Sequence, residues 1–307
     1  MLKYVLRRLL WSVVVLLAAA SFTFTLVHIV PADPARTIAG QRASDELLAS
    51  VKRELALDQP LYVQYWLFLK RAAQLDFGRS YRTRERVVEA ITQRLPATFQ
   101  LALGAMLVQL AVGIPIGILT AIRRKSLLDS SGRIVTVLLL SMPTFWLGMM
   151  LLYLFAFKIY LFPLGGYEAR GSVILPSLAL GLGGAAFYAR LLRADLIEIL
   201  NQDYIRAAYA KGLSQRSVLL RHAMRGALIP IVTLIGLDMG AFLGGIVITE
   251  RVFNWPGMGS LVVSAVLNVD TPLIMGTVLF SAAAVVVMNF LVDISYLFID
   301  PRIRLSE

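Results

Sequence analysis

Six long apolar stretches, separated by polar segments, dominate the chain. A helix needs about 20 mostly apolar residues to cross the hydrocarbon of a bilayer. The stretches are Leu9–Val30, Ala97–Ile122, Ile134–Phe157, Ser172–Ala189, Gly226–Thr249 and Leu273–Val292. Only the fifth contains a charged residue, Asp238. The pattern therefore predicts an all-α integral membrane protein with six transmembrane helices. Pro115 and Pro143 lie inside spans, where we expect them to be tolerated as kinks.

Composition narrows the chemistry that this chain can perform. Of its 307 residues, 58% are hydrophobic and 16% are charged, whereas soluble domains have roughly half and a quarter. There is no cysteine, and the two histidines, His28 and His222, lie far apart in the sequence. Disulfides, thiolate metal sites and cysteine catalysis are therefore excluded. We also expect no histidine metal site and no catalytic triad.

The chain has a net charge of +11. Most of its lysines and arginines lie in short segments beside the apolar stretches, so the charge does not indicate a nucleic-acid-binding surface. With the N-terminus placed inside, sixteen lysines and arginines fall on inner segments and three on the two short outer loops. Short inner loops are enriched in positive charge, whereas long loops escape this rule. Both termini are therefore predicted to be cytoplasmic, and the long segment 31–96 is predicted to lie outside.

The first apolar stretch has two interpretations. Lys3, Arg7 and Arg8 precede it, and Ala18–Ser21 resembles a cleavage site, as in a removable signal peptide. The apolar run nevertheless continues to Val30, beyond the about 7–15 apolar residues of a typical signal peptide. An uncleaved first span is the preferred interpretation.

The outer segment is predicted to contain short helices. Ser44–Glu46 opens a helical pattern that closes before Asp58, and Pro60 can begin a second helix that carries four aromatic residues. Those aromatics suit a helix at the level of the lipid headgroups, although packing within a small outer domain explains them equally well. A third pattern, Arg84–Leu95, is expected to end at Pro96.

These expectations divide the chain into four parts. Residues 1–30 form the N-terminal cytoplasmic end and the first span, and residues 31–96 form the extracytoplasmic segment with short helices. Residues 97–299 form a five-helix core that contains a cytoplasmic loop at 190–228, and residues 300–307 form a cytoplasmic tail.

The loop between the fourth and fifth spans is predicted to contain a short capped helix. Asp203 is the expected N-cap, because its carboxylate can accept orphan backbone N–H groups. Gly212 is the expected stop, because glycine enters the left-handed conformation freely. Ser214 can cap a further helix that reaches Pro230. Small side chains line the short helix at Ala207, Ala208 and Ala210. Such a segment suits docking into a groove of another protein, and an ordinary intracellular loop is an equal alternative.

The motif in this loop resembles the cytoplasmic coupling motif of ATP-binding-cassette importer permeases. Ala207-Ala208-x-x-x-Gly212 is similar to the branch that serves dipeptides, oligopeptides and nickel. Arg206 stands where the general motif has Glu, as is common in that branch. The resemblance implies that the segment inserts a coupling helix into a groove of the ATPase subunit. The implied coupling residues are Asp203, Tyr204, Arg206, Ala207, Ala208, Lys211, Gly212 and Leu213.

Similar pieces extend the resemblance over nearly the whole chain. They are Val27-His28-x-x-Pro31-x-Asp33-Pro34, Leu57–Leu61, Asp76–Gly78, Pro96–Thr98, Arg221–Ala223, Thr249–Gly259 and Asp300–Arg304. The resemblance implies a type I importer permease, of the first permease subunit type, in a bacterial plasma or inner membrane. It also implies a second homologous permease, two ATPase subunits that use ATP and magnesium, and an extracytoplasmic substrate-binding protein. Since the sequence has no Gly-x-x-x-x-Gly-Lys-Ser/Thr motif, we expect no cofactor in this chain itself.

The fifth predicted span has two distinct faces. Gly236, Gly240 and Gly244 form a double Gly-x-x-x-Gly ridge, which allows close helix packing in lipid. Asp238 projects about 160° away from the centre of this ridge. Since a charge inside a membrane rarely faces lipid, this helix is expected to be central. Asp238 then either lines the pathway or makes a structural hydrogen bond.

Other residues within or beside the spans are candidates for function or packing. Gly113-x-x-x-Gly117 and Gly181-x-Gly183-Gly184 are expected to pack helices. The residues around the proline of the third span are candidate pathway residues, with core packing as the alternative. They are Ser141, Met142, Thr144 and Phe145. A predicted outer turn is a candidate gate or receptor contact, with a simple interfacial turn as the default. Its residues are Glu250, Trp255, Pro256 and Gly257.

The sequence therefore predicts a pore-forming subunit of an ATP-driven importer, which translocates peptides, or nickel or other small solutes, delivered by an external binding protein. The alternative is an ATP-independent secondary transporter or channel, which would be expected to carry more intramembrane ionisable groups than Asp238. An intramembrane enzyme is disfavoured, because the chain lacks a catalytic constellation. The motifs do not distinguish peptide from nickel transport.

Overall fold

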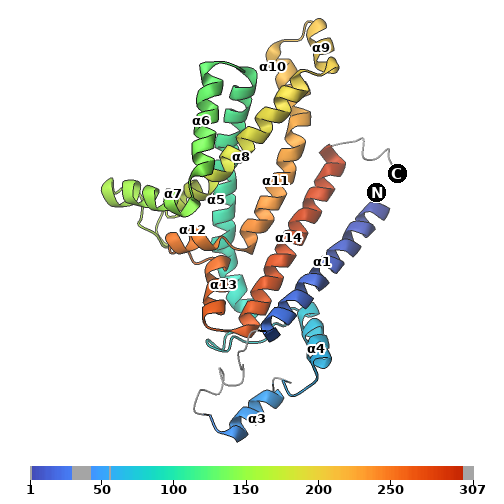
Figure 1. The fold of residues 1–307 in the computed structure, drawn as a ribbon, viewed down its shortest axis with the longest axis vertical. Helices are drawn as coiled ribbons and strands as arrows, with labels where there is room; N and C mark the ends of the chain where they lie inside the picture. The colour runs from blue at the N-terminus through green and yellow to red at the C-terminus, as the bar shows by residue number, and fades with distance from the viewer. Residues whose placement is uncertain (1, 30–42, 55–56, 300–307) are drawn as a thin grey trace. The chain divides into compact units, whose positions relative to one another are not determined.

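The computed structural model describes residues 2–29, 43–54 and 57–299, and the regular structure of this part is helical (Figure 1). The helices are α1 (Leu2–Ile29), α3 (Asp45–Glu54), α4 (Leu61–Ala73), α5 (Val87–Ile122), α6 (Leu127–Ser141), α7 (Thr144–Leu151), the π-helix η1 (Leu152–Lys158), α8 (Ile174–Leu200), α9 (Asp203–Ala210), α10 (Gln215–Ser217), the π-helix η2 (Val218–Ala223), α11 (Met224–Gly244), α12 (Val247–Val252), α13 (Met258–Leu267) and α14 (Thr271–Ile299). The family-like pieces at 31–34 and 300–304, and the tail 300–307, lie outside the described residues.

Five helices in the described part are long and apolar enough to cross a membrane, and a bent pair makes a sixth if it is counted as one span. The five lie at Val5–Val27, Val87–Ile122, Ile174–Leu200, Gln215–Gly244 and Thr271–Ser295. Each overlaps one of the predicted apolar stretches. The prediction of an all-α membrane protein is confirmed.

The third predicted span is broken at Pro143. α6 and the following α7–η1 segment are bent by 99° relative to each other. Met142, the C-cap of α6, is extended at φ −82° and ψ 122°, and Pro143 is the N-cap of α7. The ring of a proline disfavours a helical conformation for the residue before it. The expectation that Pro143 would be tolerated as a kink is therefore wrong, because one helix ends there and another begins.

At Pro96, unlike at Pro143, the helix continues. The expected helix end at this residue is wrong, because α5 runs without interruption from Val87 to Ile122. Side chains on both sides of the proline, at Ile91, Ala97 and Leu101, are 4% exposed or less. Burying all three requires helical backbone through the proline, so packing outweighs the local preference.

The helices form two compact units. The first comprises Met1–Thr98, Gly240–Val247 and Pro256–Phe290. In it, Ser21 of α1 shares a hydrogen bond of 2.6 Å with the Tyr65 hydroxyl of α4, and Phe24 packs on the Tyr65 ring. The start of α5 shares a buried core with α13 and α14. The predicted short helices of the outer segment are present as α3 and α4, and one side of α4 packs while Tyr62 and Trp66 stay exposed.

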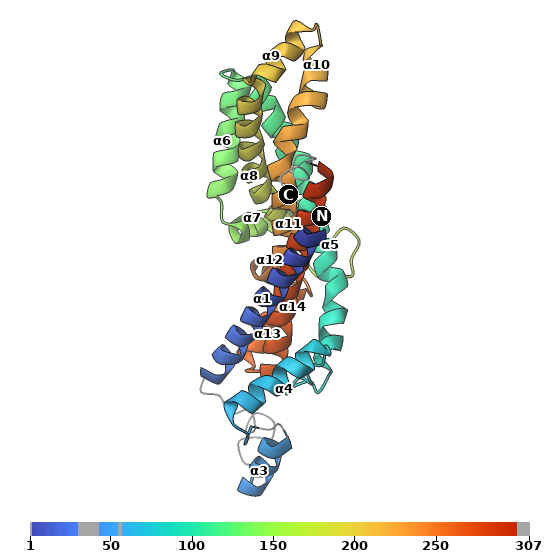
Figure 2. The ribbon, with the colours of Figure 1, turned by 90° about the vertical axis from the view of Figure 1, so that its right-hand side faces the viewer.

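The second unit comprises Phe99–Met239, Ile248–Trp255 and Leu291–Glu307. Within it, α5, α6, α8 and α11 run side by side in both views (Figures 1 and 2). α9 and α10 lie at the same end of these helices as the turn between α5 and α6, and α7 and α12 lie at the opposite end. This arrangement places the predicted coupling segment at one end of a helical bundle.

Candidate coupling site at α9

The short helix α9 ends in a complete glycine stop. Gly212 has φ +81°, its N–H donates to the Tyr209 carbonyl at 2.9 Å, and the Leu213 N–H donates to the Ala208 carbonyl at 3.3 Å. These two bonds form the Schellman arrangement, which satisfies carbonyl groups at a helix end. The predicted helix stop at Gly212 is confirmed.

The start of α9 differs from the prediction by one residue. Gln202 is the N-cap, in an extended conformation and without a side-chain capping bond, and Asp203 is the first helical residue. The Gln202 N–H still donates to the Ile199 carbonyl, in the last turn of α8. Because Gln202 itself is extended, it separates α8 from α9. Asp203 pairs instead with Arg206 at 3.3 Å, and both side chains are exposed.

A second capped helix follows α9. Ser214 is the N-cap of α10 and accepts from the Ser217 N–H at 3.4 Å, as the sequence predicts. The helical run then continues through η2 and α11, past Pro230, to Gly244. The helix that was predicted to reach Pro230 is therefore present, and it continues beyond this residue. α9 is held between two long membrane helices, α8 and the run that leads into α11.

One side of α9 is buried in the bundle and the other is exposed. Ile205 and Ala208 are 0% and 6% exposed, and they belong to the main core of the second unit. Tyr204, Tyr209 and Leu213 are large apolar side chains that remain exposed. The other expected coupling residues on the exposed surface are Asp203, Arg206, Ala207, Lys211 and Gly212. Ala208 is therefore part of the seat of α9 rather than of its outer face.

α9 rests on a stripe of α8. Tyr188, Leu192 and Leu196 follow one another at four-residue spacing and are 1% exposed or less. Residues four apart share one face of a helix. Ile205 of α9 and Val218 of η2 belong to the same buried cluster. Since close-packed interiors have little void volume, a displacement of α9 acts directly on this stripe.

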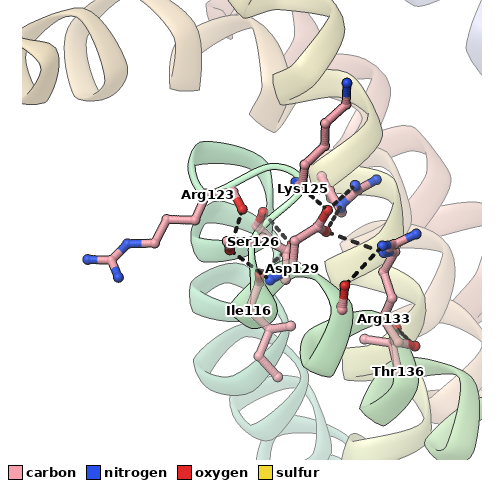
Figure 3. Close-up of polar contacts among 11 residues, drawn as sticks. Ile116, Arg123, Lys125, Ser126, Asp129, Arg133 and Thr136 are labelled. Atoms are coloured by element: carbon pink, nitrogen blue, oxygen red, sulfur yellow. Dashed lines mark hydrogen bonds and ion pairs between the residues drawn. The ribbon is translucent and has the colours of Figure 1, made fainter.

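An ion pair joins α8 to the start of α6. Arg193 donates from Nε and Nη2 to the two carboxylate oxygens of Asp129, at 2.9 and 3.1 Å. Asp129 is 1% exposed and also accepts from the Lys125 N–H at 3.0 Å. Arg133, one turn along α6, lies 3.5 Å from the same carboxylate (Figure 3). One buried carboxylate therefore holds the α5–α6 turn, α6 and α8 together, about two turns before α8 ends.

Neither partner of this ion pair was among the residues predicted from sequence. A signal for Asp129 exists, because Ser126 is the N-cap of α6 and accepts from the Asp129 N–H at 3.3 Å. A serine followed three residues later by an acid is a helix-start pattern. The pairing with Arg193 has no local signal, since the two residues are 64 positions apart.

Asp238 takes part in a partly buried polar contact of the second unit. The Tyr188 hydroxyl donates to the Asp238 carboxylate at 2.9 Å, and the Gln109 side chain also hydrogen-bonds to it. Gly184 faces Gln109, whose amide would overlap a Cβ at that position. Side chains from α5, α8 and α11 therefore meet at one carboxylate, and the sequence pattern identified only the carboxylate.

Glycines allow α5 to approach α8 closely. A Cβ on Gly113 would lie 2.7 Å from the Ala185 carbonyl oxygen, and one on Gly117 would lie 3.0 Å from that of Ala189. Gly181 faces α5 in the same way, at 2.7 Å from the Ala105 carbonyl oxygen. The prediction that the second and fourth spans pack through glycine is confirmed.

The glycine ridge of the fifth span lies on α11. A Cβ on Gly240 would lie 3.0 Å from Val285 Cα, and one on Gly244 would lie 3.3 Å from Ser281 Cβ, both on α14. The Ser281 hydroxyl donates to the Gly244 carbonyl at 2.9 Å. Gly236 is buried. α11 ends at Gly244 and Gly245 has φ +118°, so the predicted span Gly226–Thr249 is interrupted there.

The candidate pathway residues of the third span surround the break between α6 and α7. The Ser141 hydroxyl donates back to the Val137 carbonyl at 2.9 Å, and the Phe145 ring is 45% exposed. Met142 and Thr144 are half-buried. These residues therefore form a corner rather than the wall of a straight helix.

The candidate outer turn comprises Glu250 in α12 and residues after this helix, and it is largely buried. Glu250 and Trp255 are 0% and 1% exposed, and the Trp255 N–H donates to the Glu250 carbonyl at 2.7 Å. The Tyr167 ring meets the Trp255 ring edge-on at 5.1 Å between centroids. In the first unit, Pro256 is half-buried and Gly257 is the N-cap of α13. The tryptophan is therefore a packing residue of the second unit.

Comparisons with known proteins agree with these features. Residues 113–305 match the family described as binding-protein-dependent transport system inner membrane component, and residues 1–102 match the N-terminal family of such membrane components. The chain is 41% identical over 304 residues to the glutathione transport system permease protein GsiC of Salmonella paratyphi A, with 99% of each chain covered. It is 40% identical to the GsiC protein of Escherichia coli K12 over the same share.

Two solved structures of the MetNI methionine ABC transporter, in inward-facing conformations, have a similar fold. Their TM-scores are 0.55 and 0.56 at 16% sequence identity, and they cover 69% of this chain and 96% and 97% of their own. The helical core of this chain is therefore the fold of an ABC importer permease.

The fold and the matches define a membrane permease of an ATP-driven importer. The chain belongs to the family of binding-protein-dependent transport system inner membrane components, and it is a multi-pass permease of the inner membrane. In such a transporter the ATPase is a separate subunit. The predicted importer permease is confirmed, and the alternative of an ATP-independent transporter or channel is set aside.

Proposed function

We propose that this chain and a second homologous permease form the translocation path of an importer that carries short peptides of the glutathione type. Two ATPase subunits, which use ATP and magnesium, power the complex, and an extracytoplasmic binding protein supplies the cargo. The choice of cargo is supported by relatives that are 40–41% identical and described as glutathione transport permeases. Residues 97–299 are the transport core, residues 190–228 its cytoplasmic coupling loop, and both termini are cytoplasmic.

The observation that supports the coupling role best is that α9 is buried on one side and exposed on the other. Ile205 and Ala208 are locked into the core, while Tyr204, Tyr209 and Leu213 remain exposed. A helix seated in this way can transmit force, and its exposed apolar side chains need a partner surface. We assign Asp203, Tyr204, Arg206, Ala207, Lys211, Gly212 and Leu213 to the contact with the ATPase, and Ala208 to the seat of α9.

In the proposed cycle, ATP closes the ATPase dimer and moves α9. The stripe Tyr188–Leu196 carries this movement along α8, and the Asp129–Arg193 ion pair makes α6 follow. Binding of ATP can shift the permease only through different affinities for its two states. We therefore propose that the ion pair is kept in both states, so that α6 and α8 move as one body.

We propose a structural role for Asp238, which anchors α11 to Tyr188 of α8. The corner around Pro143 remains the candidate for a pathway wall, with Ser141, Met142, Thr144 and Phe145. Gly236, Gly240 and Gly244 are assigned to helix packing. Glu250, Trp255, Pro256 and Gly257 are assigned to the framework of the outer gate, because most of this segment is buried.

The test is reconstitution of the complete complex. The permease is co-purified with candidate permease, ATPase and binding-protein partners, placed in liposomes, and ATP hydrolysis and uptake are measured with glutathione, a dipeptide and nickel as separate cargoes. We expect the binding protein with glutathione to stimulate hydrolysis and uptake. Uptake without ATP would contradict the importer, and stimulation by nickel or the dipeptide alone would contradict the proposed cargo.

A further inference from the structure

A compact turn that carries four exposed arginines precedes α5. We call residues 79–86 the arginine turn. An isolated antiparallel bridge joins Arg79 to Arg86, and the Ser80 N–H donates to the Glu85 carbonyl at 2.9 Å. The Arg84 N–H donates back to the Ser80 carbonyl at 3.1 Å. The backbone of the turn is therefore closed on itself and has a fixed shape.

A buried carboxylate anchors the turn. The Ser80 hydroxyl and the Tyr81 N–H both donate to Asp270, and Ser80 and Asp270 are 1% and 2% exposed. The Ser80 hydroxyl oxygen also accepts hydrogen bonds from the backbone N–H groups of Arg82 and Thr83. Burial and the nearby Asp270 raise the pKa of Tyr81 to about 12, so its phenol is neutral at physiological pH. A satisfied buried network of this kind makes a surface turn rigid.

The exposed charge of the turn is positive. Arg79, Arg82 and Arg84 are exposed, and among the described residues no carboxylate lies within ion-pair distance of them. The Arg86 side chain lies 3.8 Å from Glu89 in an ion pair whose two side chains are exposed. Glu85 is the acidic residue of the arginine turn. It is half-buried, and its carboxylate accepts a hydrogen bond from the Gln93 side-chain amide at 2.7 Å.

An apolar corner lies beside the turn. We call residues 266–270 the α13–α14 corner, and it is tied to the turn by Asp270 and by a hydrogen bond from Arg82 to Asn268. Leu267 is 74% exposed and Val266 is 54% exposed. Val269 has φ +51°, a strained conformation for a β-branched residue. Such strain persists only where the surrounding structure imposes it, and it is typical of functional surfaces.

We propose that the arginine turn and the α13–α14 corner together form a docking surface for an acidic face of the external binding protein. The inference rests on the proposed function, which requires such a protein. Exposed apolar side chains beside arginines are typical of protein interfaces. Guanidinium groups at fixed spacing suit carboxylates, to which they can bind in a bidentate manner.

The position of the turn on α5 agrees with an external partner. The arginine turn leads into the first residue of this helix, which has 36 residues and is therefore about 54 Å long. The turn also belongs to the segment 31–96, which the proposed topology places outside the membrane, so an external partner can reach it.

Anionic lipid headgroups would also attract arginine. Attraction to a lipid surface scales with charge and needs no fixed geometry. The turn is instead held by a buried serine and a buried carboxylate, and its neighbour is an exposed leucine on a rigid corner. These features favour a protein partner of defined shape.

The test uses the complete complex in nanodiscs of phosphatidylcholine, with ATP hydrolysis measured against the concentration of the binding protein. The variant is Arg79→Gln/Arg82→Gln/Arg84→Gln, and Arg79→Gln/Arg84→Gln keeps the Arg82–Asn268 bond as a check on folding. The matched control removes three cations elsewhere in the first unit, as Arg53→Gln/Lys70→Gln/Arg71→Gln. Assembly and basal hydrolysis are measured for every variant.

We expect the triple turn variant to raise the half-saturating concentration of the binding protein by about tenfold at low salt. The double variant should show part of this shift, and the control less than about twofold. Basal and maximal hydrolysis should stay unchanged, and the difference should shrink at high salt because ions screen exposed charges. Leu267→Ala should also raise the half-saturating concentration of the binding protein, and this increase should remain at high salt.

Three results would overturn the inference. One is an unchanged half-saturating concentration in the triple turn variant, and another is an equal shift in the control. The third is a shift that is absent in phosphatidylcholine and appears only when phosphatidylglycerol is added, which would assign the turn to lipid. If the binding protein fails to stimulate even the wild-type complex, the proposed function itself fails, and that result is recognisable before any variant is compared.

Discussion

The ion pair between Asp129 and Arg193 gives the sharpest quantitative prediction. Removing one partner of a buried ion pair costs about 3–5 kcal/mol, because it leaves a buried charge without compensation. Here the Asp129 side chain is 2% exposed and that of Arg193 is 23% exposed, so water partly compensates the remaining arginine. We therefore expect Asp129→Asn to destabilise the second unit by about 2–3 kcal/mol.

A double-mutant cycle isolates the pair itself. Asp129→Asn, Arg193→Gln and the double variant are unfolded in mixed micelles by a rising fraction of denaturing detergent. The coupling energy should be about 1.5–3 kcal/mol, since the two groups share two charge-assisted hydrogen bonds. In the assembled complex, the single variants should hydrolyse ATP with less transport per ATP, because α6 no longer follows α8.

The chain supplies a matched control pair. Asp203 and Arg206 are 3.3 Å apart, but their side chains are 96% and 71% exposed. Exposed pairs contribute about 0–1 kcal/mol, and the same cycle on this pair should give a coupling energy near zero. Additive effects of the Asp129 and Arg193 replacements, or equal coupling in the two pairs, would refute the reasoning.

Three further predictions concern single positions. Gly212→Ala should cost about 1 kcal/mol and reduce ATPase coupling without affecting membrane insertion, because φ +81° is strained for alanine although its Cβ would meet open space; normal coupling in liposomes would count against the role of α9. Tyr188→Phe should destabilise by about 1–3 kcal/mol, because Asp238 loses a buried donor. If Asp238→Asn lowers uptake while leaving assembly and thermal stability intact, the structural role of Asp238 is wrong. Gly113→Leu should separate α5 from α8 and lower the thermal midpoint of the complex, whereas Gly183→Ala, where a Cβ meets nothing within 4 Å, should not.

Local chemistry was sufficient to predict much of the segment around α9. The helix stop at Gly212 and the cap at Ser214 appear as predicted, because each depends on backbone geometry within a few residues. Likewise, the apolar stretches required membrane helices, since lipid leaves the backbone no other way to satisfy its hydrogen bonds. These features depend on the residues themselves and on the solvent.

Tertiary packing decided the rest. Pro96 and Pro143 carry the same local preference, yet α5 passes through the first and the helix breaks at the second, because only burial around Pro96 outweighs that preference. The partners of Asp129, Asp238 and Asp270 come from distant segments, and no local pattern predicts which arginine, tyrosine or serine they meet. The sequence alone determined where the long apolar helices lie, although not the breaks at Pro143 and Gly244, and it determined the short helix α9 and its stop. Only the folded chain decided which face of α9 is buried, because that depends on side chains of α8 and η2 that lie close in space and apart in sequence.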